Sequence, residues 1–465
     1  MISSVKEFKN VFFIGVAGTG MSALAQYLAG SGKNVSGSDR YFKEGELNDT
    51  RSKLEAAGIH CFQQDGEGIH DDTDLVVVSA AIEDSVYEVH KAKKLSKPIV
   101  KRSELLAIIA KSKKTIAVGG TSGKSTTSAM LFDVLQLAGL EPSIISGAGL
   151  ISIIKEGKIG NAKVGQGEWL IIEADESDGS IVEYTAEVGL LLNVDKDHQE
   201  MEELMTIFTE FKHNTKELFI INQNNAFAKV LSENNMQDFS GDDSNPAGYT
   251  GINFSQDGMT ITFDIRKASD GSVNSFTLQT VGRHNMENAV AAVAVANQLG
   301  IDMEVCASGL KQYEGIYRRH QLLGIRNGIH VIDDYAHNPV KCAASIAACQ
   351  AIAPKVVAWF QPHGYGPTRF LKDDFIKEIS ASLRDNDEIW MSEIFYAGGT
   401  AEKNISSEEL IEGIKETGKK AYFISDRKQF LKSVRPHLQM PCVLLLMGAR
   451  DPGLEAFCRS IWKDL

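Results

Sequence analysis

The sequence predicts an α/β protein in which three successive blocks each form a mainly parallel sheet covered by helices. Short apolar runs alternate with helical patterns along the chain, and this alternation is typical of parallel sheets. It occurs three times, and 465 residues are enough for about three domains that each bury their own core. We therefore expect domains at residues 1–112, 113–321 and 322–465, with the basic segment Lys111–Lys114 at the first junction.

The composition restricts the kinds of partner. The formal net charge of -13 argues against a general binder of nucleic acids or anionic membranes, since both ligands require a basic surface. The six cysteines include no Cys-x-x-Cys pair, which predicts reduced thiols rather than a zinc site or a disulfide framework. The N-terminus has no apolar signal core, and no apolar run reaches the roughly 18 residues of a membrane span. These features predict a soluble protein of the cytoplasm.

The first block contains a glycine-rich turn directly after a strand. The apolar run Val11–Ile14 leads into Gly15-Val16-Ala17-Gly18-Thr19-Gly20-Met21, and a helical pattern follows. The second strand ends in Ser38-Asp39, and the third, Leu75–Val78, ends in Ser79-Ala80. Glycines after one strand and an acid after the next are similar to a dinucleotide-binding fingerprint, although the glycine spacing differs from the standard one. The turn indicates a site for a nucleotide diphosphate, and plain packing of helix on sheet is the alternative.

The second block opens on a phosphate-binding loop. The apolar run Thr115–Val118 leads into Gly119-Gly120-Thr121-Ser122-Gly123-Lys124-Ser125-Thr126-Thr127. Glycines let consecutive backbone N–H groups converge on an anion, and the N-terminus of the following helix adds about half a positive charge. In such loops the lysine reaches the outer phosphates and the next hydroxyl binds magnesium, here Lys124 and Ser125. The loop is one residue tighter than the standard pattern, and a purely structural turn is the alternative.

Acidic residues follow the next strand of the second block. Trp169–Ile172 predicts a buried strand, and Glu173-Ala174-Asp175-Glu176-Ser177-Asp178 follows it. Carboxylates at the mouth of a parallel sheet with a phosphate loop are suited to Mg²⁺, whereas a solvated acidic loop is the simpler interpretation. A further strand, Val188–Asn193, ends shortly before His198, which is either part of the same site or an ordinary histidine.

The rest of the chain divides into an insert and the third block. Between about residues 233 and 281 the pattern is that of a β-hairpin, with strands at Ile261–Ile265 and Ser275–Leu278 around Asp270-Gly271. In the third block, polar residues again follow apolar strands, at Asp333–Pro339 and Gln361–Arg369. We expect the insert to be structural and these strand ends to carry polar groups at one edge of the sheet.

The order of these motifs resembles one family, the Mur ligases, which are ATP-dependent, amide-forming enzymes of peptidoglycan assembly. The resemblance covers essentially the whole chain. Three motifs, Gly15–Ser22, Glu173–Ser180 and Gln361–His363, are similar to the branch that joins L-alanine to UDP-N-acetylmuramate. The resemblance implies a Rossmann-like N-terminal domain for the UDP-sugar, a central domain of the P-loop ATPase type, and a Rossmann-like C-terminal domain for the incoming amine.

The resemblance also implies the chemistry. The γ-phosphate of ATP would activate a carboxylate as an acyl phosphate, and an amine would attack it to give an amide, ADP and phosphate. Water must be excluded, because it would hydrolyse the acyl phosphate. The implied catalytic residues are Lys124, His198 and Arg319, and the implied Mg²⁺ ligands are Ser125, Glu173 and His198.

The binding residues follow from the same resemblance. Those implied for ATP are Gly120, Thr121, Gly123, Lys124, Ser125, Thr126, His284, Asn285 and Asp334. Those implied for the UDP-sugar are Gly15, Gly18, Gly20, Ser38, Asp39, Ser79 and Ala80. Those implied for the amine are Tyr335, His337 and Arg369.

Several positions depart from the family pattern. Ser122 and Asn338 stand where the L-alanine branch usually has His, and Gly364 stands where the family has Arg. Without a bidentate carboxylate clamp at position 364, the identity of the acceptor stays open. Lys212 lies near the place where some branches carboxylate a lysine, and we interpret it as a surface residue.

Three alternative functions remain. The nearest is a recycling ligase that attaches an intact tripeptide to the same UDP-sugar, and that enzyme usually has Tyr where this chain has Ser177. A catalytically inactive nucleotide-binding homologue is the second, and an oxidoreductase that uses the first block alone is the third. The retained Lys124 and the second phosphate loop disfavour both. We expect a monomer or homodimer that uses ATP and Mg²⁺, with UDP-N-acetylmuramate and L-alanine as substrates.

Overall fold

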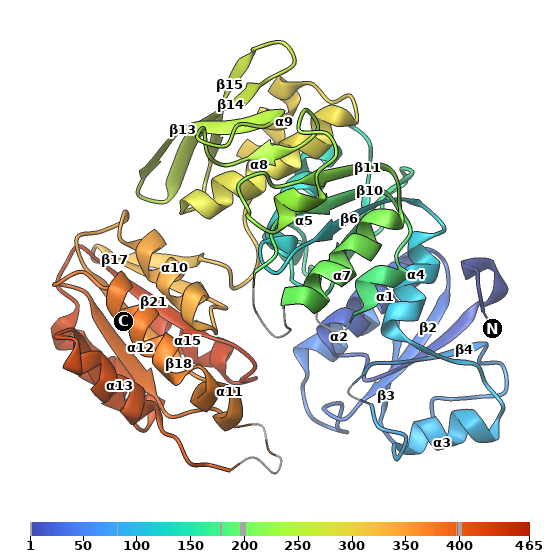
Figure 1. Cartoon of the computed structure of the whole chain (residues 1–465). Helices are drawn as coiled ribbons and strands as arrows, with labels where there is room; N and C mark the ends of the chain where they lie inside the picture. The colour runs from blue at the N-terminus through green and yellow to red at the C-terminus, as the bar shows by residue number, and fades with distance from the viewer. Residues whose placement is uncertain (1, 81, 177–178, 196–200, 397, 399–401) are drawn as a thin grey trace. The chain divides into compact units, whose positions relative to one another are not determined.

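The computed structural model describes residues 2–80, 82–176, 179–195, 201–396, 398 and 402–465 (Figure 1). The chain divides into two compact units. The first comprises Met1–Phe254, Thr262–Leu278 and His284–Ile316, and the second comprises Ser255–Ile261, Gln279–Arg283 and Tyr317–Leu465. The predicted α/β class is confirmed, because three of the sheets are mainly parallel and carry helices. In the described part of the chain, no helix combines the length and the apolar character that a membrane crossing requires.

The first unit begins with a five-stranded parallel sheet in the order β3-β2-β1-β4-β5. Its strands are β1 (Asn10–Ile14), β2 (Asn34–Asp39), β3 (His60–Gln63), β4 (Leu75–Val78) and β5 (Ile99–Lys101). Its helices are α1 (Thr19–Gly30), α2 (Asp49–Ala56), α3 (Tyr87–Lys94) and α4 (Arg102–Ala110). Val11 to Ile14 are buried, as expected for a central parallel strand covered on both faces. Because β2, β1 and β4 are neighbours, their carboxyl ends meet at one edge of the sheet.

The central sheet of the first unit has six strands in the order β11-β10-β6-β9-β7-β8, of which β8 is antiparallel to β7. The strands are β6 (Lys114–Gly119), β7 (Ser143–Ile145), β8 (Ala162–Lys163), β9 (Trp169–Ala174), β10 (Ala186–Leu191) and β11 (Thr215–Ile221). The helices are α5 (Lys124–Leu137), α6 (Ile151–Ile154), α7 (Met201–His213), α8 (Arg283–Gln298) and α9 (Met303–Lys311). The alanine-rich helix α8 is buried along most of its length, since its small side chains allow close packing on several sides.

The predicted hairpin lies within a four-stranded sheet of the order β12-β13-β14-β15. The strands are β12 (Phe239–Ser240), β13 (Tyr249–Asp257), β14 (Thr260–Lys267) and β15 (Val273–Leu278). The turn at Asp270-Gly271 is confirmed: Gly271 has φ +71°, and the Asp270 carboxylate accepts a hydrogen bond from Ser272 N at 2.9 Å. The hairpin prediction is therefore correct, although it includes only two of the four strands.

The second unit contains a six-stranded sheet in the order β16-β17-β21-β18-β19-β20, in which β16 is antiparallel to β17. The strands are β16 (Gln321–Arg326), β17 (Ile329–Asp334), β18 (Val356–Gln361), β19 (Glu388–Ser392), β20 (Lys420–Ile424) and β21 (Cys442–Gly448). The helices are α10 (Pro339–Cys349), α11 (Tyr365–Phe370), α12 (Lys372–Ser382), α13 (Ser407–Glu416), α14 (Phe430–Val434) and α15 (Leu454–Asp464). Helices α10, α12 and α13 build one hydrophobic core on this sheet, and α14 and α15 build the other.

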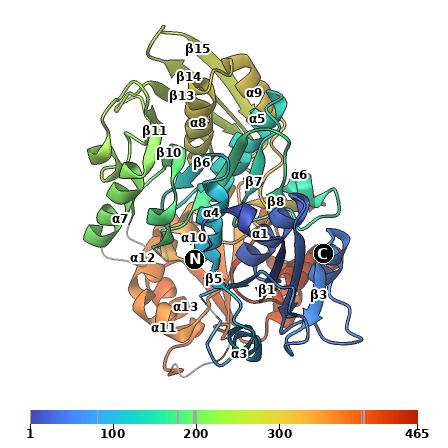
Figure 2. The same cartoon turned by 90° about the vertical axis from the view of Figure 1, so that its right-hand side faces the viewer.

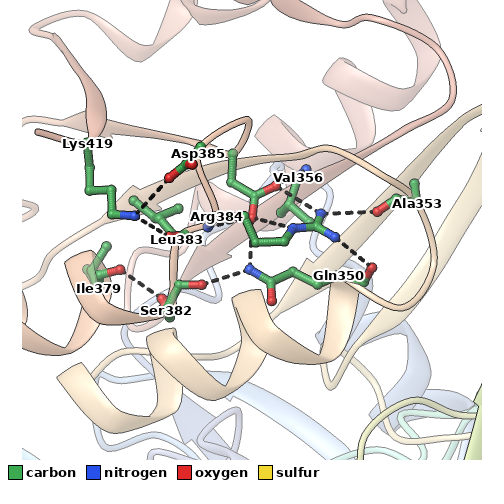
Figure 3. Close-up of polar contacts among 10 residues, drawn as sticks. Gln350, Ala353, Val356, Ile379, Ser382, Leu383, Arg384, Asp385 and Lys419 are labelled. Atoms are coloured by element: carbon green, nitrogen blue, oxygen red, sulfur yellow. Dashed lines mark hydrogen bonds and ion pairs between the residues drawn. The ribbon is translucent and has the colours of Figure 1, made fainter.

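A polar cluster joins α10, α12 and the start of β18 in the second unit (Figure 3). The buried carboxylate of Asp387 accepts hydrogen bonds from Val356 N at 2.8 Å, from Gln350 Nε2 at 2.8 Å and from the Arg384 guanidinium at 3.0 Å. The same guanidinium donates to the carbonyls of Gln350 and Ala353, each at 3.1 Å. Charge-assisted hydrogen bonds of this kind fix the loops between these elements in one arrangement.

Candidate functional site

The phosphate loop lies between β6 and α5, as predicted. Two of its glycines have positive φ angles, +134° at Gly120 and +86° at Gly123, where L side chains are strained. A Cβ atom on Gly123 would also lie 2.5 Å from Oδ1 of Asn288 on α8. The backbone conformation therefore favours glycine at position 123, and a larger residue would displace the Asn288 side chain. Thr121, Ser122 and the start of α5 complete the cradle.

Asn193, just after β10, holds this loop in place. Its Oδ1 accepts hydrogen bonds from Thr121 Oγ1 at 2.9 Å and from Ser122 N at 2.8 Å, and its Nδ2 donates to the Ser122 carbonyl at 3.1 Å. The sequence prediction did not assign a role to Asn193. The available signal was its position, because β10 is the direct neighbour of β6 and both strands end at the same edge of the sheet.

Lys124, the first residue of α5, is paired inside the site. Its Nζ donates to the Gly120 carbonyl at 2.6 Å and lies 2.6 Å from Oε2 of Glu176. The two side chains are 16% and 8% exposed, so the pair is largely shielded from water. Burial raises the pKa of Glu176, although the charge of Lys124 acts against this shift. A carboxylate thus lies in direct contact with the lysine of the phosphate loop.

Glu173, near the end of β9, lies next to the hydroxyl of Ser125. Ser125 Oγ donates to Glu173 Oε2 at 2.9 Å, while Ser146 Oγ at 2.7 Å and Gly147 N at 2.6 Å donate to Glu173 Oε1. A hydroxyl and a carboxylate so close to each other are hard oxygen ligands that suit Mg²⁺. The third predicted ligand, His198, lies outside the described residues. In the part of the chain that the structure describes, no three His, Cys, Asp or Glu side chains group together as a metal site.

The residues predicted for the adenine lie at the start of α8. Asn285 is buried and accepts a hydrogen bond from Asn288 Nδ2 at 3.3 Å, whereas His284 is exposed. The side chain of Asn288 also lies against Gly123, and it therefore connects Asn285 with the phosphate loop. Asn288 was missed by the sequence prediction, although its spacing of three residues from Asn285 puts both on one helix face.

The residues predicted for the UDP-sugar meet at the carboxyl edge of the N-terminal sheet. Gly15 has φ +81°, and Gly15 N donates to the Ser38 carbonyl at 2.8 Å. The Asp39 carboxylate accepts a hydrogen bond from Ala17 N at 3.0 Å, which fixes the glycine-rich turn. The other members of the set are Gly18, the residue before α1; Gly20 in its first turn; half-buried Ser79; and exposed Ala80.

Two features near this edge were not predicted. The side chain of Arg102 lies against Gly20, where a Cβ atom would be 2.9 Å from Arg102 Cδ. A hollow of about 260 Å³ lies at the ends of β2 and β3, and its lining residues are Asp39, Arg40, Phe42, Lys43, Gln63, Gln64 and Asp65. Arg102 brings a cationic side chain beside the glycine-rich turn, and a guanidinium is suited to a phosphate group.

In the second unit, the segment after α9 presents two adjacent arginines with different surroundings. Arg318 is buried and its Nε lies 3.0 Å from Asp333 Oδ2, so it is a structural ion pair. Arg319 is exposed, and its guanidinium lies 5.1 Å from the ring centre of Tyr335. Of the two, Arg319 alone has its guanidinium at the surface, as the predicted catalytic role requires.

Asp334, at the end of β17, is buried and ionised. It accepts a hydrogen bond from His320 N at 3.2 Å. Burial opposes its ionisation, but the nearby His320 and Arg319 and a hydrogen bond from Ser345 outweigh this effect, so the pKa of Asp334 is lowered. An ionised carboxylate that ends a parallel strand is suited to accept hydrogen bonds from ribose hydroxyls.

His337 lies between two other rings of the second unit. Its ring centre is 5.7 Å from that of Tyr335 and 5.7 Å from that of His363. Burial lowers the pKa of His337 to about 4, and Lys341, His363 and Arg319 add to the effect. His337 Nδ1 lies 3.0 Å from the Tyr335 carbonyl, which can only accept, so Nδ1 carries the proton and Nε2 has a free lone pair. The predicted Tyr335 and His337 thus lie together.

Arg369 on α11 has other partners. Its Nη1 donates to Asn404 Oδ1 at 2.6 Å and lies 3.9 Å from Glu402, and the side chain is 51% exposed. No contact between Arg369 and Tyr335 or His337 is found among the described interactions. A role toward the amine therefore stays a prediction for this residue.

Two of the positions that depart from the family pattern, Gly364 and Asn338, have structural explanations. Gly364 has φ +74° and precedes α11, a conformation in which an arginine would be strained. Asn338 caps α10, because its Oδ1 accepts a hydrogen bond from Lys341 N at 2.9 Å. Ser122 contacts Asn193 only through its backbone, so these hydrogen bonds do not explain why serine stands at this position. Lys212 is not a fully exposed surface residue, since its side chain is 18% exposed and Nζ lies 2.6 Å from Glu233.

Comparison with known proteins identifies the family. Three family models match successive parts of the chain: "Mur ligase family, catalytic domain" at residues 10–114, "Mur ligase middle domain" at 118–296, and "Mur ligase, glutamate ligase domain" at 318–450. The chain is 34% identical over 467 residues to the UDP-N-acetylmuramate–L-alanine ligase of Syntrophomonas wolfei, covering 98% of this chain and 95% of the relative. It is 33% identical to the enzyme of the same name from Agrobacterium fabrum, with 94% and 93% covered.

Solved structures agree with this result. The crystal structure of the UDP-N-acetylmuramate-alanine ligase of Thermotoga maritima matches with a TM-score of 0.80 at 25% identity, and the match covers 98% of each chain. A murein peptide ligase of Psychrobacter arcticus has the same fold, with a TM-score of 0.66 at 20% identity over 98% of each chain. The chain belongs to the Mur ligase family of ATP-dependent, ADP-forming ligases.

Proposed function

We propose that this enzyme joins L-alanine to the carboxylate of UDP-N-acetylmuramate in the cytoplasm, while ATP is converted to ADP and phosphate. The observation that carries the proposal is the assembled phosphate loop, in which Lys124, Ser125 and Glu173 lie within contact of one another or of the loop backbone. The names of the relatives support L-alanine as the amine.

The residues of the first unit fit the phosphoryl-transfer step. A carboxylate oxygen of the UDP-sugar attacks the γ-phosphorus, and ADP leaves. Lys124 is placed at the loop to stabilise the negative charge of the transferred group. Ser125 and Glu173 would hold Mg²⁺, which neutralises phosphate charge when it is bound.

The residues of the second unit fit amine binding. In the second step the nitrogen of the amino acid attacks the acyl carbon, phosphate leaves, and the nitrogen loses a proton. His337 is neutral and has a free Nε2 lone pair, so it can accept a hydrogen bond from the amine. The rings of Tyr335 and His363 lie next to this ring, and the Arg319 guanidinium lies over the ring of Tyr335.

A tripeptide is the second candidate for the amine substrate. The fold match to a murein peptide ligase and the glycine at position 364 favour it, because a small free amino acid benefits most from a carboxylate clamp. The higher TM-score of the alanine ligase structure favours the single amino acid.

The test is release of phosphate from ATP in the presence of UDP-N-acetylmuramate and one amine at a time. We expect release with L-alanine and less with L-serine or glycine. Release with tripeptide alone would replace L-alanine by the peptide, and no release with any of the four amines would contradict the ligase function. Omission of the UDP-sugar is the control for plain hydrolysis of ATP.

A further inference from the structure

Helix α1 lies beside β8 of the central sheet (Figure 2), and its first two turns are hydrogen-bonded to one buried side chain, that of Asn161. Asn161 precedes β8 and is 1% exposed. Its Nδ2 donates to the Thr19 carbonyl at 2.8 Å and to Ser22 Oγ at 3.0 Å, and its Oδ1 accepts from Gln26 Nε2 at 2.7 Å. These three partners occupy the first two turns of α1, directly after the glycine-rich turn that ends at Gly18.

The backbone of Asn161 holds the segment that positions Glu173. The Asn161 carbonyl accepts a hydrogen bond from Ser146 N at 2.9 Å, which extends the pairing of β7 with β8 by one residue. Ser146 Oγ and Gly147 N then donate to Glu173 Oε1 at 2.7 and 2.6 Å. The opposite carboxylate oxygen, Oε2, faces Ser125.

A continuous path of hydrogen bonds therefore runs from the start of α1 to the carboxylate predicted to hold Mg²⁺. Every step is short, and Ser22, Asn161 and Ser146 are all at most 2% exposed. Water cannot easily replace a lost partner at such depth, so an unpaired amide there costs more than at the surface. The hydrophobic core that α1 shares with the central sheet stabilises the contact between them. Apolar contacts are not directional, so this core does not fix the orientation of α1.

We propose that Asn161 is a positioning residue that couples occupation of the UDP-sugar site to the magnesium and ATP site. The inference rests on the function proposed above. A diphosphate bound at Gly15–Gly20 fixes the N-terminus of α1, and with it Thr19 and Ser22. Through its hydrogen bonds, Asn161 then fixes the positions of Ser146 and Glu173 as well. By linkage, ATP with Mg²⁺ strengthens binding of the UDP-sugar by the same factor.

The experiment measures the affinity for a non-hydrolysable ATP analogue with Mg²⁺ by calorimetry, with and without saturating UDP-N-acetylmuramate. In the wild-type protein we expect the sugar nucleotide to tighten analogue binding about tenfold. In Asn161→Ala we expect this ratio to fall below about twofold, and in the milder variant Gln26→Leu, which removes one of the three side-chain hydrogen bonds, an intermediate ratio.

Asn297→Ala is the matched control. Asn297 also makes two side-chain hydrogen bonds, with Ile301 O and Tyr249 Oη, but it lies at the far end of α8 from Asn285. It should keep the wild-type ratio. Two results would overturn the coupling through Asn161 and leave the proposed function intact, provided that the wild-type protein binds the UDP-sugar. The first is an affinity ratio that is unchanged in Asn161→Ala and Gln26→Leu. The second is an affinity ratio of one in the wild-type protein. If the wild-type protein does not bind the UDP-sugar, both are overturned.

Discussion

Lys124 shows how a single residue of the phosphate loop can be tested. The loop geometry predicts that Lys124→Ala lowers ATP-dependent phosphate release at least about 100-fold, because one preorganised charge at the transferred group is lost. The fold should be retained, as judged by far-ultraviolet circular dichroism. Lys114→Ala is the control, since Lys114 is 51% exposed and pairs with Glu168. A Lys124→Ala protein with more than a tenth of the wild-type rate would contradict the assignment.

His337 gives a prediction on pH and stability. Its pKa is lowered to about 4, below the roughly 6.5 of an unfolded histidine. The unfolded state therefore binds the proton more tightly, and stability is present above about pH 6.5 and lost as the pH falls toward 4. We expect the free energy of unfolding by urea to drop less between pH 7 and pH 5 in His337→Gln than in the wild type. His60→Gln, at an exposed histidine, should show the wild-type drop.

The missed site residues share a physical cause. The proximity of Lys124, Ser125 and Glu173 was predictable, because each belongs to a local pattern at the end of a strand of one parallel sheet, and their roles stay predictions. Asn193 and Asn288 act on the same loop, but each reaches it from a distant part of the chain. Sequence spacing gives no direct information on such contacts until the order of the strands and the packing of α8 are known. The same reason explains why Glu176, although named among the acids, was not paired with Lys124.

At the scale of elements, we expect the polar cluster around Asp387 to contribute measurably to stability. Asp387→Asn should lower the free energy of unfolding by about 2 to 3 kcal/mol at neutral pH, because several donors lose a buried charged acceptor. Asp385→Asn is the control: Asp385 is fully exposed, 3.7 Å from Lys419, and little change is expected (Figure 3). Equal effects of the two substitutions would show that the cluster is not what stabilises this region.

The same carboxylate predicts the direction of the pH dependence. Burial opposes ionisation of Asp387, but hydrogen bonds from Arg384 and Val356 outweigh it, so the pKa is lowered. Its stabilising effect is therefore present above the unfolded pKa of about 3.9 and is lost as the pH falls through the folded value. The stability difference between wild type and Asp387→Asn should shrink below about pH 4 in urea unfolding experiments.

Strands with a strong apolar pattern were predictable from the sequence, whereas the very short strands that pair with longer ones were not. The runs at Val11–Ile14 and Leu75–Val78 form β1 and β4, and the turn at Asp270-Gly271 is where the hairpin pattern puts it. The short strands β12 and β8 have only two residues each, which is too few for any periodicity. Their formation depends on the neighbouring strand, so that only the folded chain defines them.

For the whole molecule, the division into two compact units predicts unfolding in two steps. Each unit has its own hydrophobic core, so cooperative unfolding of one does not require the other. Differential scanning calorimetry should show two transitions. UDP-N-acetylmuramate should raise the transition of the first unit by mass action, because all the residues predicted to bind it lie in that unit. Asp387→Asn should lower only the transition temperature of the second unit.

The control for this assignment is the combination of both changes. UDP-N-acetylmuramate added to Asp387→Asn should move the two transitions in opposite directions, each by the amount seen alone. A single transition that responds to both the sugar nucleotide and the substitution would contradict independent units. The α/β class and the number of blocks were predictable from the alternation of patterns, whereas the shared core of the N-terminal and central sheets was not. That core depends on side chains from both blocks.

The pair of Lys124 and Glu176 has a consequence for the product of the reaction. An anion that enters the phosphate loop must first displace a carboxylate that is already in contact with the lysine. Inorganic phosphate would break this pair and gain few other contacts, whereas ATP also gains those offered around Ser125, Glu173 and Asn285. The pair of Lys124 and Glu176 therefore opposes binding of the phosphate that each turnover releases. We expect weak product inhibition by phosphate, and stronger inhibition once Glu176 is replaced by Gln.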